Sequence, residues 1–188
     1  MRLYLLRHTP VKSSPAICYG QSEVALSSSY PTDLGQVRVK LKQLHFNAIV
    51  SSPLGRCKRL AEDLAIGDLV FDNRLLEFNF GDWEQKTWEQ IGEGNIRQWA
   101  DHLDAYHCPN GESYADLRKR TVSFWKDSIA QYPGKTILVV THAGVIRCLL
   151  ASALDMPLHN AFRLQIDYGS LSAITLANGQ PRVLFTNR

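Results

Sequence analysis

The chain has 188 residues, of which 45% are hydrophobic and 21% charged, so it can bury a substantial core and is unlike disordered, collagen-like or disulfide-rich proteins. Its formal net charge is +3 at pH 7, and Lys and Arg are scattered among acidic residues, which gives no reason to expect a nucleic-acid partner. The first apolar run is cut by Arg7 and His8 and is too short for a signal peptide or a membrane span. We therefore expect a single domain over residues 1–188, without a membrane partner, in the cytoplasm.

The four cysteines give no sign of a metal site or a disulfide framework. They are Cys18, Cys57, Cys108 and Cys148, and none belongs to a Cys-x-x-Cys pair or to a short Cys/His spacing of the zinc type. A chain of this size without an export signal does not need disulfides. We expect reduced thiols and neither a metal ion nor a cofactor.

The first third of the chain predicts short buried strands that open onto polar loops. Residues 2–6 are a mostly apolar run that ends in charge, as in a buried strand. Residues 9–32 carry three prolines and little periodicity, which favours a long surface loop, and such loops are often functional. Asp33 can cap a helix over about residues 34–44, and residues 48–50 then form a second strand.

The rest of the chain continues this alternation. Residues 54–64 and 112–131 have the helical spacing of apolar residues, and residues 136–140 are the clearest buried strand. Short helices are expected around Trp88 and Trp99, and an apolar helix over residues 145–154. The remaining strand candidates are residues 69–71, 162–166, 171–176 and 182–185, the last two joined across Asn178-Gly179.

Strands that alternate with helices indicate an α/β fold, a three-layer sandwich in which helices flank a largely parallel central sheet. In such sheets the ligand lies beyond the carboxyl ends of the strands. Three loops follow strands at that edge, namely Arg7-His8-Thr9, residues 51–56 and residues 141–144. The functional site is therefore expected among these loops.

Two arginines and two histidines fall at or just past these strand ends. Arg7 and His8 follow the first strand, Arg56 the second, and His142 the clearest buried strand. Convergent guanidinium groups suit a phosphate because they present paired donors to its oxygens, and the N–H of Ala143 at a helix start would add another donor. A neutral imidazole there can attack phosphorus while a protonated one stabilises the equatorial oxygens. His8 is the preferred nucleophile and His142 the stabiliser, although side-chain chemistry alone permits the reverse order.

A leaving alkoxide needs a proton, and Glu77 is the preferred acid. Its neighbours in residues 75–81 are largely apolar, and apolar surroundings raise a carboxyl pKa. Asp82 and Glu84 are the alternatives.

Single residues of this set also fit structural roles. Arg56 can pair with Glu62 or Asp63 on its own helix, and a histidine at a strand end is more often a hydrogen-bonded structural residue. A non-catalytic module that binds phosphorylated ligands is the alternative class of protein. It is disfavoured because nucleophile, arginines and candidate acid are all present.

Four segments in order resemble the histidine phosphatase superfamily, also called phosphoglycerate-mutase-like, over nearly the whole chain. They are Leu5-Leu6-Arg7-His8-Thr9, Ser51-Ser52-Pro53-Leu54-Gly55-Arg56-Cys57, Leu76-Glu77-Phe78-Asn79-Phe80-Gly81-Asp82-Trp83-Glu84 and Val140-Thr141-His142-Ala143-Gly144-Val145-Ile146-Arg147. The resemblance implies that His8 becomes phosphohistidine and that Glu77 donates the proton. It also implies that Arg7, Arg56 and His142 bind the phosphoryl group and that no metal is required.

Within this superfamily, Arg7-His8-Thr9-Pro10-Val11 and residues 17–26 are most similar to the α-ribazole-5′-phosphate phosphatases of cobalamin nucleotide-loop assembly. The resemblance implies a small phosphomonoester as partner, α-ribazole 5′-phosphate, with Tyr19 and Gly20 at the substrate. Glu23 stands where that subgroup tends to have Asp. A broad-specificity small-molecule phosphatase and a phosphoglycerate mutase are the alternatives that share the expected site.

Overall fold

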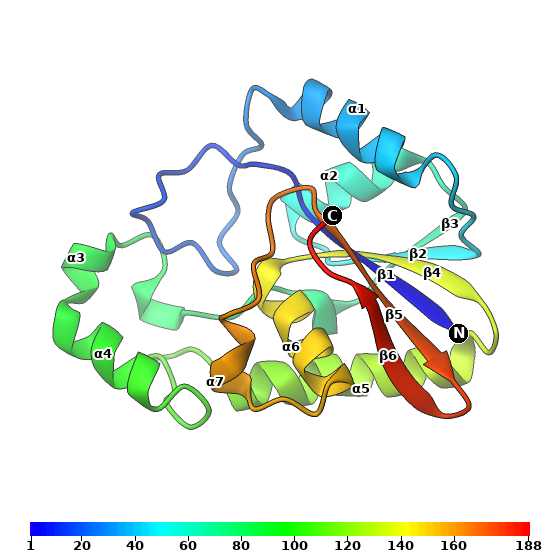
Figure 1. The fold of residues 1–188 in the computed structure, drawn as a ribbon. Coiled ribbons are helices and arrows are strands. Elements are labelled where there is room, and N and C mark those ends of the chain that lie inside the picture. Colours follow the sequence, from blue (N-terminus) through cyan, green and yellow to red (C-terminus); the bar gives the residue numbers. More distant parts are fainter.

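A six-stranded sheet forms the centre of the protein in the computed structural model, which describes residues 1–188 (Figure 1). The strands, in the order in which they lie side by side, are β3 (Asp68–Phe71), β2 (Ala48–Ser51), β4 (Thr136–Thr141), β1 (Arg2–Arg7), β5 (Leu171–Ala177) and β6 (Gln180–Phe185). The first four are parallel, whereas β5 runs antiparallel to β1 and β6 antiparallel to β5. The largely parallel sheet predicted from the sequence is confirmed.

Helices cover both faces of this sheet. They are α1 (Tyr30–Leu41), α2 (Gly55–Leu64), α3 (Trp88–Ile91), α4 (Glu93–Asp101), α5 (Tyr114–Gln131), α6 (Ala143–Ala153) and α7 (Leu158–Ala161). Figure 1 shows α1 and α2 on one face and α5 and α6 on the other, with α3 and α4 extending to one side. This is the predicted three-layer arrangement.

The side chains of β1 show how alternation along one strand builds a core on each face. Successive side chains of a strand point to opposite faces of the sheet. Leu3 and Leu5 pack in one cluster with side chains of α5 and α6, whereas Tyr4 and Leu6 pack in the other with side chains of α1 and α2. Burial of each leucine contributes about 1.5–3 kcal/mol. The carboxyl end of β1 is thereby fixed between two packed layers.

The start of α1 differs from the prediction. The helix begins at Tyr30 and ends at Leu41, and Asp33 lies within its first turn instead of preceding it. Pro31 explains the earlier start, because its fixed backbone torsion suits the first turn of a helix. The Asp33 carboxylate accepts a hydrogen bond from the Ser29 hydroxyl and is favourable near the positive end of the helix dipole.

The strand predicted over residues 162–166 is wrong. Its alternating apolar residues look like a strand, but β5 already occupies the edge of β1 that a further strand would need. Phe162 instead packs edge-on against Tyr114 with ring centroids 4.9 Å apart, and the Ile166 carbonyl accepts a hydrogen bond from Arg7. This irregular segment leads from α7 back to the carboxyl edge of the sheet.

The hairpin predicted between the last two strands is confirmed. Strands β5 and β6 pair on either side of Asn178 and Gly179, whose φ angles are +53° and +76°. Positive φ at both central residues is typical of the two-residue turn that favours Asn-Gly. The hairpin completes the sheet beyond β1.

The loop predicted over residues 9–32 ends at residue 29, just before α1 begins, and this loop of residues 9–29 is fixed at several points. Val11 and Leu26 form an isolated bridge within the loop, and Ile17 forms another with Thr87. The Cys18 N–H donates to the Lys86 carbonyl at 3.0 Å. The loop is therefore joined to the segment that precedes α3.

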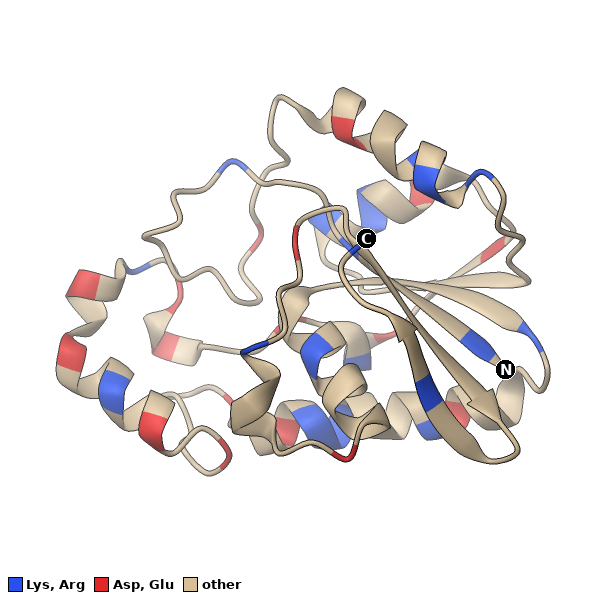
Figure 2. Ribbon diagram, in the orientation of Figure 1, with Lys and Arg blue, Asp and Glu red and all other residues tan.

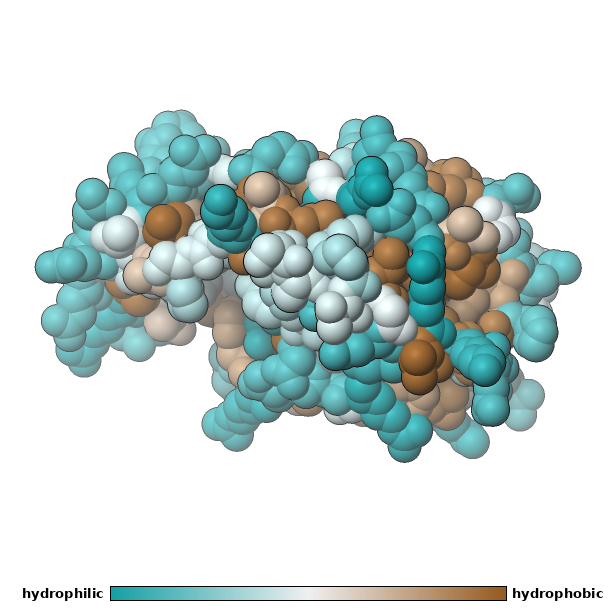
Figure 3. All heavy atoms as spheres, turned by 90° about the horizontal axis from the view of Figure 1, so that it is seen from above, coloured by the Kyte–Doolittle hydropathy of each residue, from teal (hydrophilic) through white to brown (hydrophobic).

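Charge and hydropathy are mixed over the surface. Figure 2 shows Lys and Arg interspersed with Asp and Glu on helices and loops, and Figure 3 shows hydrophobic atoms in separate patches among hydrophilic ones. None of the helices combines the length and apolar character needed to cross a lipid bilayer. All four cysteines are buried and unpaired, as expected.

Candidate active site

The carboxyl ends of β1, β2 and β4 bring the predicted residues together. His8 follows β1 and donates its backbone N–H to the Thr141 carbonyl of β4 at 3.0 Å, and Ser52 follows β2 and donates to the Val140 carbonyl at 2.9 Å. Because β4 lies between β1 and β2, His142 is placed between the other two chain segments. The imidazole rings of His8 and His142 have centroids 5.2 Å apart. The convergence predicted from the sheet edge is observed.

His8 is held as a neutral imidazole with a defined tautomer. Its side chain is 1% exposed, and burial together with the positive charges of Arg56 and Arg7 lowers its pKa well below the usual 6.5. Its Nδ1 lies 2.8 Å from the Thr9 carbonyl oxygen. A carbonyl only accepts hydrogen bonds, so Nδ1 carries the hydrogen and Nε2 keeps a free lone pair.

Arg56, in the first turn of α2, is fully buried and does not pair with Glu62 or Asp63. Its Nη1 donates to the Ser22 carbonyl at 3.0 Å and its Nη2 to the Gly20 carbonyl at 2.6 Å. The loop of residues 9–29 thus orients the guanidinium group. The structure excludes the intrahelical ion pair considered from the sequence.

Both ring nitrogens of His142 contact neighbouring side chains. Arg56 Nε donates to its Nδ1 at 3.3 Å, and its Nε2 lies 2.8 Å from Ser52 Oγ. Since Nδ1 accepts a hydrogen bond, the ring is neutral here with its hydrogen on Nε2, and burial followed by the charge of Arg56 lowers its pKa well below 6.5. The protonated imidazole expected for His142 is therefore not the form that this arrangement holds.

Arg7 reaches the same region from β1. Its Nη1 donates to the Ile166 carbonyl at 2.6 Å, its guanidinium carbon lies 3.7 Å from the ring centroid of Tyr168, and its buried Nε has no partner. No carboxylate lies within ion-pair distance of Arg7 or Arg56. Two guanidinium groups without a counter-charge, beside the first N–H groups of α6 at Ala143, favour the binding of an anion.

Glu77 is the acidic residue that lies at this site. Its Oε2 accepts a hydrogen bond from the Gly144 N–H of α6 at 3.3 Å, and its Oε1 accepts one from the Phe78 N–H at 2.9 Å. The apolar neighbours in sequence do not surround it, because Phe78 turns into the core and stacks on Tyr114 with centroids 4.6 Å apart. Glu77 itself is only partly buried.

The two alternative acids have structural contacts. Glu84 accepts hydrogen bonds from the backbone N–H groups of Gln21 and Ser22 at 2.8 and 2.7 Å and from that of Phe80 at 3.2 Å. Asp82 is exposed and accepts from Asn110 Nδ2 at 2.9 Å. Glu84 thus fixes the loop of residues 9–29, and Glu77 remains the candidate acid.

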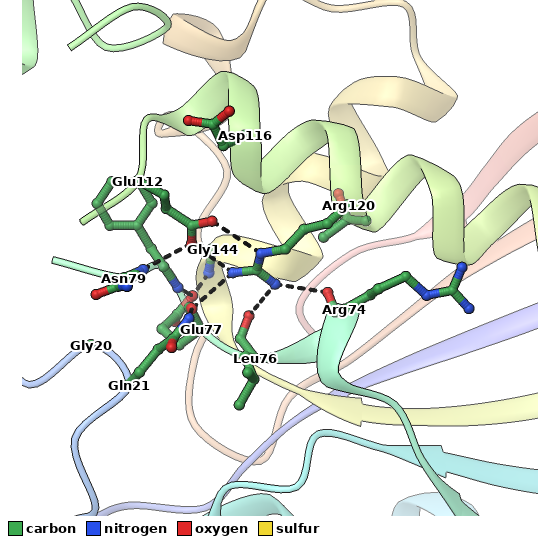
Figure 4. Close-up of polar contacts among 12 residues, drawn as sticks. Gly20, Gln21, Arg74, Leu76, Glu77, Asn79, Glu112, Asp116, Arg120 and Gly144 are labelled. Carbon is green, nitrogen blue, oxygen red and sulfur yellow. Dashed lines mark hydrogen bonds and ion pairs between the residues drawn. The ribbon is translucent and has the colours of Figure 1, made fainter. Parts of the chain in front are cut away.

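Arg120 of α5 positions the segment that carries Glu77 (Figure 4). Its Nη1 donates to the carbonyls of Arg74 and Leu76 at 2.7 and 2.6 Å, and its Nη2 donates to the Glu77 carbonyl at 2.9 Å. The same guanidinium pairs with Glu112 at 2.7 Å. A single side chain of α5 therefore fixes the backbone on both sides of Leu76.

Tyr19 and Gly20 lie next to Arg56. The Tyr19 ring centroid is 5.2 Å from the guanidinium carbon of Arg56, and the hydroxyl of Tyr19 is 3.0 Å from that of Tyr168. Gly20 adopts a φ of +39°, and a β-carbon there would collide with the Glu84 carboxylate. The observed contact of Gly20 is therefore with the arginine, which its carbonyl orients.

Sequence reasoning missed three residues that shape this site: Ser52, Arg120 and Tyr168. Ser52 stands in a segment that already carried the family resemblance, which was the available signal. The Glu77 carbonyl that Arg120 binds lies 43 positions away along the chain, and the Tyr19 hydroxyl that meets Tyr168 lies 149 positions away, so no local pattern indicates these contacts. Their roles depend on the packing of α5 and of residues 162–170 against the site.

Fold and site define a class of α/β protein that presents two histidines, two unpaired arginines and a carboxylate beyond a parallel sheet. The sequence profile of the histidine phosphatase superfamily (branch 1) matches residues 3–188, and the chain belongs to this superfamily. The superfamily comprises phosphatases and mutases, which fits this set of side chains.

Similar proteins carry several functional names. A probable phosphoglycerate mutase GpmB of Shigella boydii serotype 18 is 31% identical over 182 residues, covering 93% of this chain and 84% of the relative. A putative α-ribazole-5′-P phosphatase of Escherichia coli K-12 superposes with a TM-score of 0.90 at 22% identity and covers 100% of this chain and 96% of that one. A mycobacterial glucosyl-3-phosphoglycerate phosphatase superposes with a TM-score of 0.87 at 26% identity and covers 99% of this chain and 98% of that one. The fold is thus shared across different substrates.

Proposed function

We propose that the protein is a metal-independent phosphomonoesterase that acts through a phosphohistidine at His8. The observation that carries this proposal is the neutral His8 ring, whose Nδ1–H is held by the Thr9 carbonyl so that Nε2 is free to attack. Arg7 and Arg56 lie beside it without carboxylate partners and can neutralise the phosphoryl oxygens. The positive charge that the transition state needs thus comes from the chain itself.

The proposed reaction has two steps. In the first, the Nε2 lone pair of His8 attacks phosphorus, the bond from phosphorus to the alcohol oxygen breaks, and protonated Glu77 gives its proton to that oxygen. In the second, water attacks the phosphohistidine, the Glu77 carboxylate takes a proton from the water, and the P–N bond breaks to release phosphate. His8 returns to its neutral form and Glu77 to its protonated form.

His142 takes part through its charge. It is neutral in the arrangement described above, but an anionic phosphoryl group beside it favours the protonated ring, because an opposite charge nearby stabilises the charged form. Its hydrogen-bond partner Ser52 keeps the ring in place. His142 then stabilises the equatorial oxygens together with the N–H of Ala143.

The favoured substrate is α-ribazole 5′-phosphate. Two features support it: the similarity of residues 17–26 to the phosphatases of that ester, and the position of Tyr19 over Arg56. Phosphoglycerate mutase activity is the second candidate, because the relative from Shigella boydii, at 31% identity, is named a probable phosphoglycerate mutase. A broad-specificity phosphatase is the third.

The mechanism is tested with His8→Ala under metal-free conditions, with EDTA present and 4-nitrophenyl phosphate as substrate. We expect loss of hydrolysis and of the acid-labile phosphoenzyme that mass spectrometry detects after rapid quenching of the wild type. His45→Ala, at an exposed histidine after α1, is the matched control, and it should keep both the hydrolysis and the phosphoenzyme. Hydrolysis by His8→Ala at the wild-type rate would refute the phosphohistidine.

The substrate is tested by kcat/KM for α-ribazole 5′-phosphate, 3-phosphoglycerate, sugar phosphates and nucleotides. A preference for α-ribazole 5′-phosphate of about tenfold or more, equivalent to about 1.4 kcal/mol, is expected. Formation of 2-phosphoglycerate from 3-phosphoglycerate, followed by NMR, would instead identify a mutase. Equal values for all esters would identify a broad-specificity phosphatase.

A further inference from the structure

Tyr19 and Tyr168, here called the tyrosine pair, meet over the site from opposite sides. Tyr19 belongs to the loop of residues 9–29 and Tyr168 to the segment before β5, and their hydroxyl oxygens are 3.0 Å apart. The Tyr168 ring lies over Arg7 at 3.7 Å and over His8 at 5.4 Å, while the Tyr19 ring lies over Arg56 at 5.2 Å. The tyrosine pair therefore covers both arginines and the proposed nucleophile.

Arg7 is partly buried, whereas three other groups of the site have almost no contact with solvent. His8 is 1% exposed, and Arg56 and His142 are 0% exposed. A phosphoryl group must touch His8 Nε2 for the proposed reaction, so it cannot enter while this cover is in place. Tyr168 is itself 39% exposed, which leaves its ring room to turn outward.

The backbone around Tyr168 is fixed more firmly than its side chain. The Gly169 N–H donates to the His8 carbonyl at 3.1 Å, and the Gly169 carbonyl accepts from Lys40 Nζ at 2.8 Å. Asp167 accepts a hydrogen bond from Asn187 Nδ2 at 2.8 Å. The backbone next to Tyr168 is thus hydrogen-bonded to the backbone of the proposed nucleophile. The Tyr168 ring therefore stays beside the phosphoryl site when the hydroxyl contact opens.

We infer that the tyrosine pair is the leaving-group subsite and selects phosphomonoesters whose alcohol carries a flat aromatic ring. This inference rests on the proposed phosphatase function and adds the substrate class. When the two hydroxyl groups separate, two aromatic faces flank the path from the phosphorus outward. Aromatic rings gain about 0.5–1.5 kcal/mol from such contacts beyond the area that they bury.

The side chains at the mouth favour this ligand over an anionic alcohol such as glycerate. The two arginines that the tyrosine pair covers are those proposed to bind the phosphoryl group. Lys40 is engaged with the carbonyls of Gly169 and Arg188 at 2.8 and 3.2 Å. The two phenol rings lie next to these arginines, and they recognise a flat apolar surface and offer hydroxyl groups at its rim.

The experiment compares benzyl phosphate with cyclohexylmethyl phosphate, two esters of primary alcohols that differ in the flatness of the ring. The readout is the ratio of their kcat/KM values in wild type, Tyr168→Phe and Tyr168→Leu, because the ratio cancels any general loss of activity. We expect a wild-type ratio above one that Tyr168→Phe keeps and that Tyr168→Leu lowers by about two- to tenfold. Tyr168→Leu retains apolar bulk at a partly exposed position, and thermal unfolding confirms that it folds.

Tyr168→Phe separates the hydroxyl contact from the ring. It removes the hydrogen bond that closes the cover, so kcat/KM for both esters is expected to rise together by about two- to tenfold, the value of one such bond. An unchanged or lower kcat/KM in this variant shows that the hydroxyl contact does not limit entry.

The outcomes distinguish this inference from the function on which it rests. If Tyr168→Leu lowers kcat/KM equally for both esters, the tyrosine pair is only a structural cover and the inference is wrong. If the wild type hydrolyses neither ester and no other phosphomonoester, the proposed phosphatase function fails instead. Hydrolysis of both esters at a wild-type ratio of one overturns the aromatic selection alone.

Discussion

His8 and His142 carry the same side chain, and their hydrogen bonds make them chemically different. The His8 ring makes one hydrogen bond, from Nδ1 to the Thr9 carbonyl, whereas the His142 ring contacts Arg56 through Nδ1 and Ser52 through Nε2. A ring with a free Nε2 suits a nucleophile, and a ring held on both sides suits an electrostatic role. Side-chain chemistry left this order open, and the local geometry now supports the order that the family resemblance implied.

At the same scale, Glu77→Gln tests the proposed acid through the leaving group. We expect kcat/KM for an alkyl phosphate to fall by about a hundredfold or more, because kcat/KM reports the steps up to cleavage of the ester and general acid catalysis typically contributes that much to a poor leaving group. The kcat/KM for 4-nitrophenyl phosphate should fall much less, since nitrophenolate leaves without a proton. Glu89→Gln, at an exposed position of α3, is the control. Equal losses on both substrates would assign Glu77 a structural role.

Gly144→Ala tests the position of Glu77 without removing it. A β-carbon at Gly144 would collide with the Glu77 carboxylate, and the α6 N–H that now binds it would move as well. We expect the same dependence on leaving group as in Glu77→Gln, with a smaller loss. Gly35→Ala in α1 meets nothing within 4 Å and should stabilise the fold by about 1 kcal/mol in urea unfolding. Normal hydrolysis of alkyl phosphates by Gly144→Ala would contradict this geometry.

At the scale of elements, the sequence predicts a helix or strand well where the element's own residues determine its structure, and poorly where another element determines it. Strands β1 and β4 and helix α5 were predictable because their apolar patterns reflect burial of the element itself. The irregular structure of residues 162–166 was not predictable, because it depends on the pairing of β5 with the edge of β1. The two predicted histidines and two predicted arginines converged because they lie at or past the ends of strands of one parallel sheet. Arg120 and Tyr168 instead reach the site through contacts between distant elements.

Helix α5 contributes to both stability and the site through Arg120, which Arg120→Met tests. The substitution keeps the aliphatic length but leaves Glu112 without its partner and three backbone carbonyls without their donor. The pair is only partly buried, with side chains 20% and 15% exposed, so its loss should cost about 1–3 kcal/mol, measured as the free energy of unfolding in urea. Lys119→Met, the exposed neighbour on the same helix, should change it by less than about 0.5 kcal/mol. Similar stabilities of the two variants would show that the segment 74–77 is held by other contacts.

For the whole molecule, the two buried histidines predict how stability depends on pH. Burial and the neighbouring Arg56 lower the pKa of both His8 and His142 below the usual 6.5, the value expected in the unfolded chain. Below that pH the unfolded state binds protons that the folded state does not, so the free energy of unfolding falls as pH falls. The slope approaches about 1.4 kcal/mol per pH unit for each histidine. Carboxylates such as that of Asp116, whose pKa the hydrogen bonds from Ser113 hold below 3.8, affect stability only in more acidic solution.

This pH dependence separates the histidines from the rest of the protein. Urea unfolding between about pH 7 and about pH 5 should show a steep loss of stability in the wild type and a flatter dependence in the double variant His8→Gln, His142→Gln, because its buried amides do not titrate. The slope is the readout, since the substitutions also change packing at every pH. His45→Gln, at an exposed site, should keep the wild-type slope. Equal slopes in all three proteins would mean that His8 and His142 accept protons as readily in the folded chain as in the unfolded one, and a neutral nucleophile would no longer follow from the fold.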